Sequence, residues 1–176
     1  MSTITSDPER NTRLAPRRDT GGAQGVSVAA ARWLAERAHR GQLDANGEPY
    51  IVHVGRVAAG VPLFARPVAW LHDVMERSTV DETMLIGAGV SSDQLLAVRL
   101  LSRDSAERSD DLYLNHVRAI ALSPGAAGRI ARAVKRADLL DHISHRPSRS
   151  AGWTPPYGAA LVVLMTVNAG GPGADL

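Results

Sequence analysis

The chain has 176 residues, which is long enough for one well-buried core and too short for two comfortable domains. Only seven residues are aromatic although 44% are hydrophobic, so the core must be built from Ala, Val, Leu and Ile, which favours close-packed helices. The absence of cysteine excludes disulfides, a thiolate metal site and a cysteine nucleophile. Twenty basic and 18 acidic residues nearly cancel to a net charge of +2, which argues against nucleic acid as a partner.

The sequence indicates a cytoplasmic protein that has no membrane partner. The N-terminal residues lack the apolar stretch of a signal peptide. The apolar segment 159–167 is far shorter than the roughly 18 residues that a membrane-spanning helix needs. The lack of cysteine fits a reducing compartment.

Three regions follow from the pattern of apolar and turn residues. Residues 1–25 combine Ser, Thr, Pro, Gly and Arg without apolar periodicity and are expected to form a disordered arm. Residues 26–168 should form one helical domain, and residues 169–176 a flexible tail. Within the domain, periodicity predicts helices, in chain order, over residues 28–40, 52–61, 67–76, 82–86, 94–102, 110–122, 124–144 and 157–168.

Helix starts are marked by residues with a clear capping role. Ser27 and Ser91 can accept hydrogen bonds from the first backbone N–H groups, and Pro67 and Pro124 suit a first turn because its N–H groups have no intrahelical partner. Gly41 suits a helix end. Because no segment alternates with the period of a strand, the sequence predicts an all-α fold, a compact multi-helix bundle.

The segment 67–76 carries chemistry on an otherwise apolar helix. Val68, Leu71 and Met75 are spaced to face a core, while His72 and Asp73 fall beside them. A buried imidazole next to a buried carboxylate is costly unless a partner satisfies both groups. Such pairs occur as hydrogen-bonded core partners, and a divalent cation satisfies them as well.

A second carboxylate lies on the predicted helix 124–144. Asp138 falls on the same face as apolar core positions rather than with the neighbouring Arg and Lys side chains, so it too needs a partner. The inward polar candidates are then His53, His72, Asp73 and Asp138. Two imidazoles and two carboxylates suit Mn²⁺ or Fe²⁺ better than structural Zn²⁺, which prefers thiolates.

The order and spacing of these residues resemble the HD superfamily of metal-dependent phosphohydrolases. The closer resemblance is to the guanosine tetraphosphate (ppGpp) 3′-pyrophosphohydrolase domain of RelA/SpoT proteins and its small stand-alone relatives. Three segments carry it: Ala38–His53, with its Gly-Glu-Pro-Tyr-Ile-x-His run, Trp70–Ser78, with His-Asp, and Val134–His142, with the late Asp. The resemblance spans roughly residues 26–168.

The resemblance implies an all-α HD domain with one bound metal, Mn²⁺ being the first expectation, and a nucleotide or related phosphate ester as substrate. His53, His72, Asp73 and Asp138 would be its ligands. Glu76 would position or deprotonate the attacking water, and Arg77 follows it in the catalytic segment. Candidate substrate contacts are His39, Tyr50, Lys135 and His142. A loop-packing role for Tyr50 and His39 and a solvated helix face for Lys135 are the structural alternatives, and His116 and His145 are interpreted as surface residues.

The chain departs from the family pattern near the expected substrate. Arg77 replaces an acid, Asp44 and Ala45 replace an Arg-Lys pair, and His142 replaces an Asn expected to contact the nucleotide sugar. The favoured hypothesis is a metal-dependent phosphohydrolase, with ppGpp 3′-pyrophosphohydrolase-like activity as its most specific form. The alternative is a degenerate domain that binds metal and nucleotide as a non-catalytic sensor. A third hypothesis, a purely structural helical domain, predicts no metal.

Overall fold

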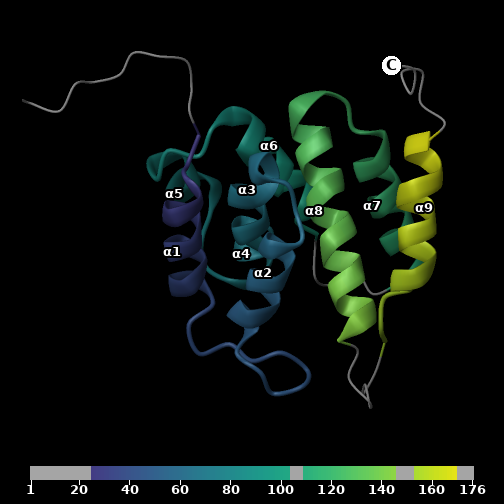
Figure 1. The fold of residues 1–176 in the computed structure, drawn as a ribbon, viewed down its shortest axis with the longest axis horizontal. Coiled ribbons are helices and arrows are strands. Elements are labelled where there is room, and N and C mark those ends of the chain that lie inside the picture. The colour runs from purple at the N-terminus through teal and green to yellow at the C-terminus, as the bar shows by residue number, and fades with distance from the viewer. Residues whose placement is uncertain (1–24, 104–108, 146–152, 170–176) are drawn as a thin grey trace, which may run out of the picture.

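Helices form nearly all the regular secondary structure of the protein, which we describe from a computed structural model covering residues 25–103, 109–145 and 153–169 (Figure 1). In chain order they are α1 (Val28–Ala38), α2 (Tyr50–Ala59), the short 3-10 helix η1 (Leu63–Ala65), α3 (Arg66–Leu71), α4 (Val74–Arg77), α5 (Glu82–Gly87), α6 (Ser92–Leu101), α7 (Asp110–Leu122), α8 (Gly125–Ser144) and α9 (Tyr157–Ala169). Within these ranges the only extended pairing is one isolated bridge between Leu43 and Pro49. The all-α prediction is confirmed.

The predicted helix ranges agree closely with the structure. Apart from residue 25, the predicted N-terminal arm lies outside the described residues, as does the predicted tail beyond Ala169, the last residue of α9. The Ser27 hydroxyl accepts a hydrogen bond from the Ala30 N–H, and Ser91 forms a reciprocal capping box with Gln94. The capping residues therefore set the helix starts that the sequence indicated.

One predicted helix is wrong, because the segment 67–76 is divided into α3 and α4. The break falls at His72 and Asp73. The His72 Nδ1–H donates to the Ala69 carbonyl at 2.8 Å, and this is the carbonyl that the Asp73 N–H would use in a continuous helix. The His-Asp pair thus lies in a turn between two short helices, where both side chains can face the same side.

Helix α8 lies between the two halves of the bundle in Figure 1, with α2, α3 and α6 on one side and α7 and α9 on the other, and it packs against all five. Its buried residues are mostly Ala, Val, Ile and Leu, as the scarcity of aromatic residues requires. At Gly60, after α2, an added Cβ would lie 3.4 Å from the Ala137 Cβ, so the chain passes close to α8 there. The small core residues let three polar side chains approach each other across these helices.

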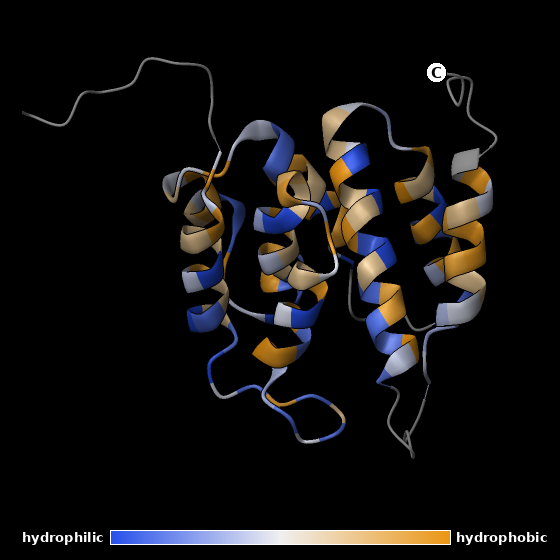
Figure 2. Cartoon of the chain, in the orientation of Figure 1, coloured by the Kyte–Doolittle hydropathy of each residue, from blue (hydrophilic) through white to orange (hydrophobic). Residues whose placement is uncertain are grey.

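Helix α9 is apolar around most of its circumference (Figure 2). It packs on α7 and α8, burying Ala160 and Leu164, and leaves Val162 and Met165 exposed. In the part of the chain that the structure describes, no helix combines the length and the apolar character needed to cross a lipid bilayer.

Candidate metal centre

Three side chains from three parts of the bundle converge at its centre. His53 comes from α2, His72 from the turn after α3 and Asp138 from α8, and one ligand atom of each lies within 4.8 Å of the others. The distance from Asp138 Oδ1 is 3.5 Å to His53 Nε2 and 3.9 Å to His72 Nε2. All three side chains are buried. The fold therefore brings together three of the four metal ligands predicted from the sequence.

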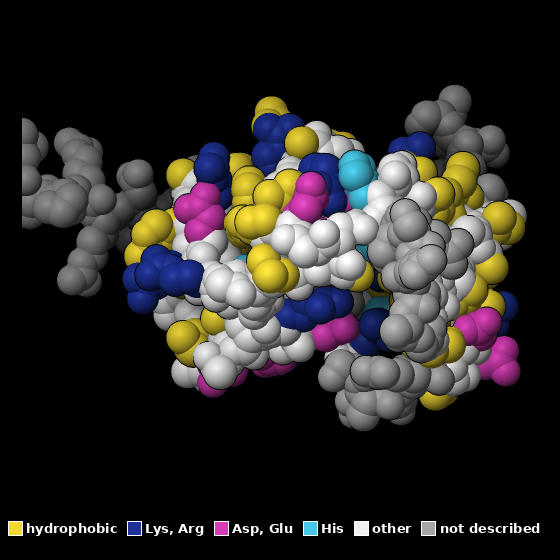
Figure 3. Space-filling model, turned by 90° about the horizontal axis from the view of Figure 1, so that it is seen from below, with side chains coloured by type: hydrophobic (Ala, Val, Ile, Leu, Met, Phe, Trp, Pro, Cys, Tyr) yellow, Lys and Arg dark blue, Asp and Glu magenta, His cyan; other side chains and the backbone are white. Residues whose placement is uncertain are grey.

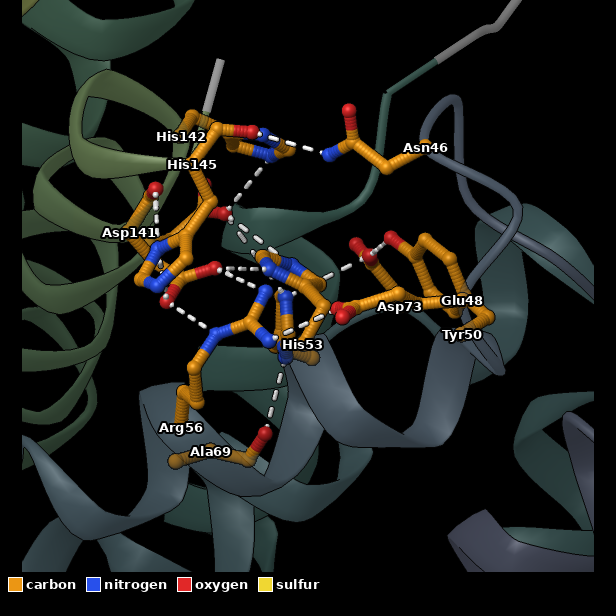
Figure 4. Close-up of polar contacts among 12 residues, drawn as sticks. Asn46, Glu48, Tyr50, His53, Arg56, Ala69, Asp73, Asp141, His142 and His145 are labelled. Carbon is orange, nitrogen blue, oxygen red and sulfur yellow. Dashed lines mark hydrogen bonds and ion pairs between the residues drawn. The ribbon is translucent and has the colours of Figure 1, made fainter. Parts of the chain in front are cut away.

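Hydrogen bonds on the far side of each ring orient the two imidazoles (Figure 4). The His72 Nδ1–H donates to the Ala69 carbonyl at 2.8 Å, and the His53 Nδ1–H donates to Asp141 Oδ2 at 2.7 Å. In the neutral rings the lone pair is therefore on Nε2, and neither Nε2 atom has a hydrogen-bond partner among the described residues. When both rings are neutral, two buried lone pairs directed at a carboxylate match the requirements of a divalent cation.

The charges around the centre respond to burial and to close partners. Burial lowers the pKa of His72, but the carboxylates of Asp73 and Asp138 and the hydrogen bond to the Ala69 carbonyl together outweigh burial and raise that pKa to about 9. Burial also lowers the pKa of His53. Burial acts to raise the pKa of the Asp138 carboxyl, yet Lys135 and His142 hold that pKa well below the usual range. Without a metal, a proton on His72 therefore supplies positive charge between the carboxylates.

Asp73, the fourth predicted ligand, lies beside the three converging groups. Its Oδ2 is 3.3 Å from His72 Nε2 and 3.5 Å from Arg77 Nε, and it accepts a close hydrogen bond from the Tyr50 hydroxyl. Burial acts to raise the pKa of the Asp73 carboxyl. The neighbouring His72 and Arg77 act in the opposite direction and the net effect is a lowered pKa, so the carboxylate is ionised. Ligation by Asp73 remains a prediction. A metal bound to Asp73 Oδ2 would compete with the Tyr50 hydroxyl for this oxygen.

A small cavity of about 40 Å³ opens beside the centre. Cationic and acidic groups line it together with the two aromatic residues Tyr113 and Tyr157. The charged lining consists of Asp73, Glu76, Asp138, Arg77, Arg103 and Lys135, joined by His72 and His142. Seen from below, histidine side chains lie near the middle of the molecular face, among both Lys or Arg and Asp or Glu side chains (Figure 3).

Glu76 and Arg77, the predicted catalytic residues, both face this cavity. Glu76 accepts hydrogen bonds from the Arg103 backbone N–H at 3.1 Å and from Arg103 Nη2 at 3.3 Å. The Arg77 guanidinium lies 4.6 Å from the centre of the Tyr50 ring, in a cation–π contact, and is half-exposed. Arg77 therefore adds positive charge at the rim, where the family pattern has an acid.

Lys135 differs most from the neighbouring basic residues of its helix. Its Nζ donates to Asp138 Oδ2 at 2.9 Å, and the residue is buried. Burial lowers the pKa of Lys135, but Asp138 outweighs it and keeps the ammonium charged. The solvated-face alternative is wrong for Lys135, whereas it holds for the exposed neighbour Arg136.

The hydrogen bonds of the first motif segment build a loop, and substrate contact by His39 and Tyr50 remains a prediction. His39 is buried, its Nδ1–H donates to Gln42 Oε1 at 3.0 Å, and Gln42 Nε2 in turn donates to the Arg77 carbonyl. Asp44 Oδ1 accepts from the N–H groups of Asn46 and Glu48 at 2.8 and 2.9 Å. The described cavity lining includes neither His39 nor Tyr50, so loop building and positioning of Asp73 are the roles that this geometry supports.

Two histidines interpreted as surface residues have different outcomes. His145 is exposed, as predicted, and its backbone carbonyl accepts a hydrogen bond from the Asn46 amide at 3.1 Å (Figure 4). His116 is half-buried, and its Nε2 is fully buried without a hydrogen-bond partner among the described residues. Burial lowers the pKa of His116 to about 4. The surface interpretation of His116 is therefore wrong, because α7 directs the ring inward beside Leu101.

Sequence reasoning missed the residues that orient the predicted ligands. Asp141 binds the His53 ring and accepts two hydrogen bonds from Arg56, at 2.7 and 3.1 Å, and Arg103 holds Glu76. Asp141 did carry a signal, because it lies one helical turn after Asp138 on the same face of α8. Arg56 and Arg103 carried none, since their partners are distant in sequence.

No family model matches the chain, and no match was found among curated proteins. The resemblance to HD phosphohydrolases therefore stays a prediction from the three motif segments of the sequence.

Proposed function

We propose that the protein is a divalent-metal-dependent phosphohydrolase that acts on a nucleotide or a related phosphate ester. The observation that carries the proposal is the pair of buried Nε2 atoms of His53 and His72, which have no hydrogen-bond partner among the described residues and are directed at Asp138, beside a cavity lined by three basic and three acidic side chains. His53, His72 and Asp138 would hold the metal, with Asp73 as the expected fourth ligand. When bound, such a cation lowers the pKa of a coordinated water and neutralises charge that develops on phosphoryl oxygens.

The chain's own residues supply the remaining functions. Lys135, Arg77 and Arg103 present positive charge to the cavity, and a phosphoryl group needs such charge in both ground and transition states. Glu76 lies one helical turn from Asp73 on the cavity wall and can accept a proton from water. Arg103 fixes the Glu76 carboxylate through one backbone and one side-chain hydrogen bond, so a phosphate that draws the Arg103 guanidinium away would free Glu76 Oε1 for this role.

The size of the cavity limits how a substrate would bind. At about 40 Å³ it has room for a small group, whereas sites that enclose a whole drug-sized ligand measure about 300 Å³ or more. The reacting phosphoryl group would therefore enter the cavity, and the rest of the ester would lie outside it. Within this class, the motif resemblance makes guanosine 3′,5′-bis(diphosphate) the first substrate to test, with hydrolysis at its 3′-pyrophosphate.

The test is phosphate or pyrophosphate release from a nucleotide panel that includes ppGpp, using chelator-treated protein with and without Mn²⁺. We expect turnover that requires metal and falls at least about 100-fold in Glu76→Gln, because one general base contributes roughly that much or more. Glu48→Gln is the matched control, since Glu48 is an exposed acid outside the cavity lining. Turnover that is equal without metal, or unchanged in Glu76→Gln, would contradict the proposal.

A second candidate function is a sensor that binds metal and nucleotide without cleaving. The Arg103–Glu76 contact favours it, because Arg103 occupies the carboxylate that would have to accept a proton from water, and Arg77 places a further positive charge on the cavity lining. Nucleotide binding without turnover in the wild type, together with turnover gained in Arg77→Asp, would select the sensor. Metal-dependent turnover in the wild type selects the enzyme.

A further inference from the structure

We infer that His142 is a metal ligand, so that the centre contains three imidazoles rather than two. The inference rests on the proposed metal centre and deepens it. His142 Nε2 lies 3.2 Å from Asp138 Oδ1, the same oxygen that is 3.5 Å from His53 Nε2 and 3.9 Å from His72 Nε2. Three imidazole nitrogens therefore surround one carboxylate oxygen.

These spacings resemble those between neighbouring ligands of one metal ion. With bonds near 2.1 Å, adjacent ligand atoms lie about 3.0 Å apart at a right angle and about 3.4 Å apart at the tetrahedral angle. The His142 and His53 distances from Asp138 Oδ1, 3.2 and 3.5 Å, match this range, and the His72 distance of 3.9 Å is slightly longer. The ligand atoms of His53, His72 and Asp138 all lie within 4.8 Å of one another, and His142 lies outside this group but contacts Asp138 Oδ1, so a small movement of its ring toward the other two imidazoles would complete the centre.

The spacing of the rings gives a second, independent comparison. Two imidazoles bound to one metal through Nε2 have ring centres about 4.6 Å apart at a right angle and about 5.3 Å apart at the tetrahedral angle, given the same bond length. The ring centres of His53 and His142 are 4.7 Å apart, and those of His53 and His72 are 5.5 Å apart. The His142 ring is thus placed relative to His53 as a second ligand would be.

Packing holds His142 in this position. Its ring stacks on Tyr157 with centres 4.6 Å apart and planes 6° from parallel, and Tyr157 begins α9. The two residues line the cavity together, and His142 follows Asp138 by one turn of α8. In the metal-free protein Nε2 faces Asp138 as a hydrogen-bond donor, and an imidazole can transfer its proton to Nδ1 without moving. The same nitrogen then becomes a ligand.

A third imidazole also changes which metal is preferred. Imidazole suits Fe²⁺, Co²⁺ and Zn²⁺ better than Mn²⁺, which favours oxygen ligands. The resemblance to RelA/SpoT hydrolases, which have Asn at this position, implied Mn²⁺ and a substrate contact for residue 142. His142 as a ligand predicts instead that this chain binds a later transition metal more tightly, relative to Mn²⁺, than the Asn variant does.

The experiment compares the purified full chain with His142→Asn, which installs the family's residue, and with His145→Asn, which removes an exposed imidazole near the same helix end. Chelator competition measures Co²⁺ and Mn²⁺ affinity, and pulsed EPR of the Mn²⁺-loaded proteins counts directly coordinated imidazole nitrogens. We expect three nitrogens in the wild type and in His145→Asn, and two in His142→Asn. Co²⁺ affinity should fall at least about 100-fold in His142→Asn, and Mn²⁺ affinity by less.

The outcomes separate the inference from the proposed function. Two coordinated nitrogens in both the wild type and His142→Asn would overturn the ligand role of His142 and leave the metal centre intact. An unchanged ratio of Co²⁺ to Mn²⁺ affinity would overturn it as well. If the wild type bound neither metal, the centre itself would be absent and the proposed function would fail with it.

Discussion

His53 and Asp141 form a buried hydrogen bond that joins α2 to α8, with His53 Nδ1 2.7 Å from Asp141 Oδ2. Arg56 donates to both oxygens of the same carboxylate. Burial raises the pKa of Asp141, but the hydrogen bonds from Arg56 and His53 outweigh it and keep the carboxylate ionised. The bond fixes the His53 proton on Nδ1, so that Nε2 presents its lone pair to the site.

Asp141→Asn should therefore weaken metal binding although Asp141 is no ligand. The amide is a poorer acceptor and can rotate its NH₂ group toward the ring, so the orientation of His53 loosens. We expect metal affinity to fall about 10- to 100-fold, the usual effect of losing an orienting partner. Chelator competition measures it. Glu48→Gln serves as the control, because Glu48 Oε2 is the other carboxylate oxygen near Arg56, 3.4 Å from its Nη1. Equal metal affinities in Asp141→Asn and Glu48→Gln would contradict the orienting role of Asp141.

The stability of the metal-free protein should fall as pH rises above neutral, because His72 titrates. Its pKa is about 9 in the folded protein, against about 6.5 for a free imidazole. The protonated form is thus favoured by folding. Its contribution, about 3 kcal/mol at most, is fully present below pH 6.5 and is lost as pH rises through 9.

Urea unfolding of chelator-treated protein between pH 6 and 9.5 measures this loss, and His72→Gln should remove most of the slope. A metal that takes the place of the proton should bind more tightly as pH rises over the same interval, with proton release on binding. Identical pH profiles for wild type and variant would show that His72 is not the titrating group.

The helices were predictable from the sequence because their starts and faces depend on local residues. Ser91 forms a capping box with Gln94, three positions later, and such a motif can be recognised from the local sequence without knowledge of the tertiary structure. The division of the segment 67–76 was not predictable, since it depends on a histidine side chain that bonds to the backbone of its own helix. Propensity alone favours a continuous helix there.

The sequence predicted three side chains that the fold brings together, and it did not predict the residues that orient them. Spacing placed Asp138 on an inward face, and the motif segments pointed to His53 and His72. Lys135 lies only three positions before Asp138, yet a helix with several basic residues gives no sign of which one turns inward. Arg103 and Glu76 are 27 positions apart, and only the packing of α6 brings them together.

Lys135→Met should make stability depend strongly on metal. Lys135 and Asp138 form a buried ion pair, and removing one partner of such a pair leaves an uncompensated charge that costs about 3 kcal/mol or more. We expect a lower melting temperature for the metal-free variant and a larger increase on adding metal than in the wild type, because the cation restores the missing charge. Arg136→Met changes the exposed neighbour and should alter neither value. Equal metal-induced shifts in wild type and Lys135→Met would contradict this account of the pair.

His116 should make the protein sensitive to mild acid. Its pKa is about 4 in the folded protein because burial disfavours the charged ring, so the unfolded chain takes up a proton more readily. The contribution of His116 to stability is therefore fully present above pH 6.5 and is lost as pH drops toward 4, by about 3 kcal/mol in total. His116→Leu removes the titrating group and also the unpartnered Nε2. We expect the variant to be at least as stable as the wild type at pH 8 and clearly more stable at pH 4.5, measured by urea unfolding at both values. Parallel pH profiles for the two proteins would mean that the ring is solvated, as a surface histidine would be.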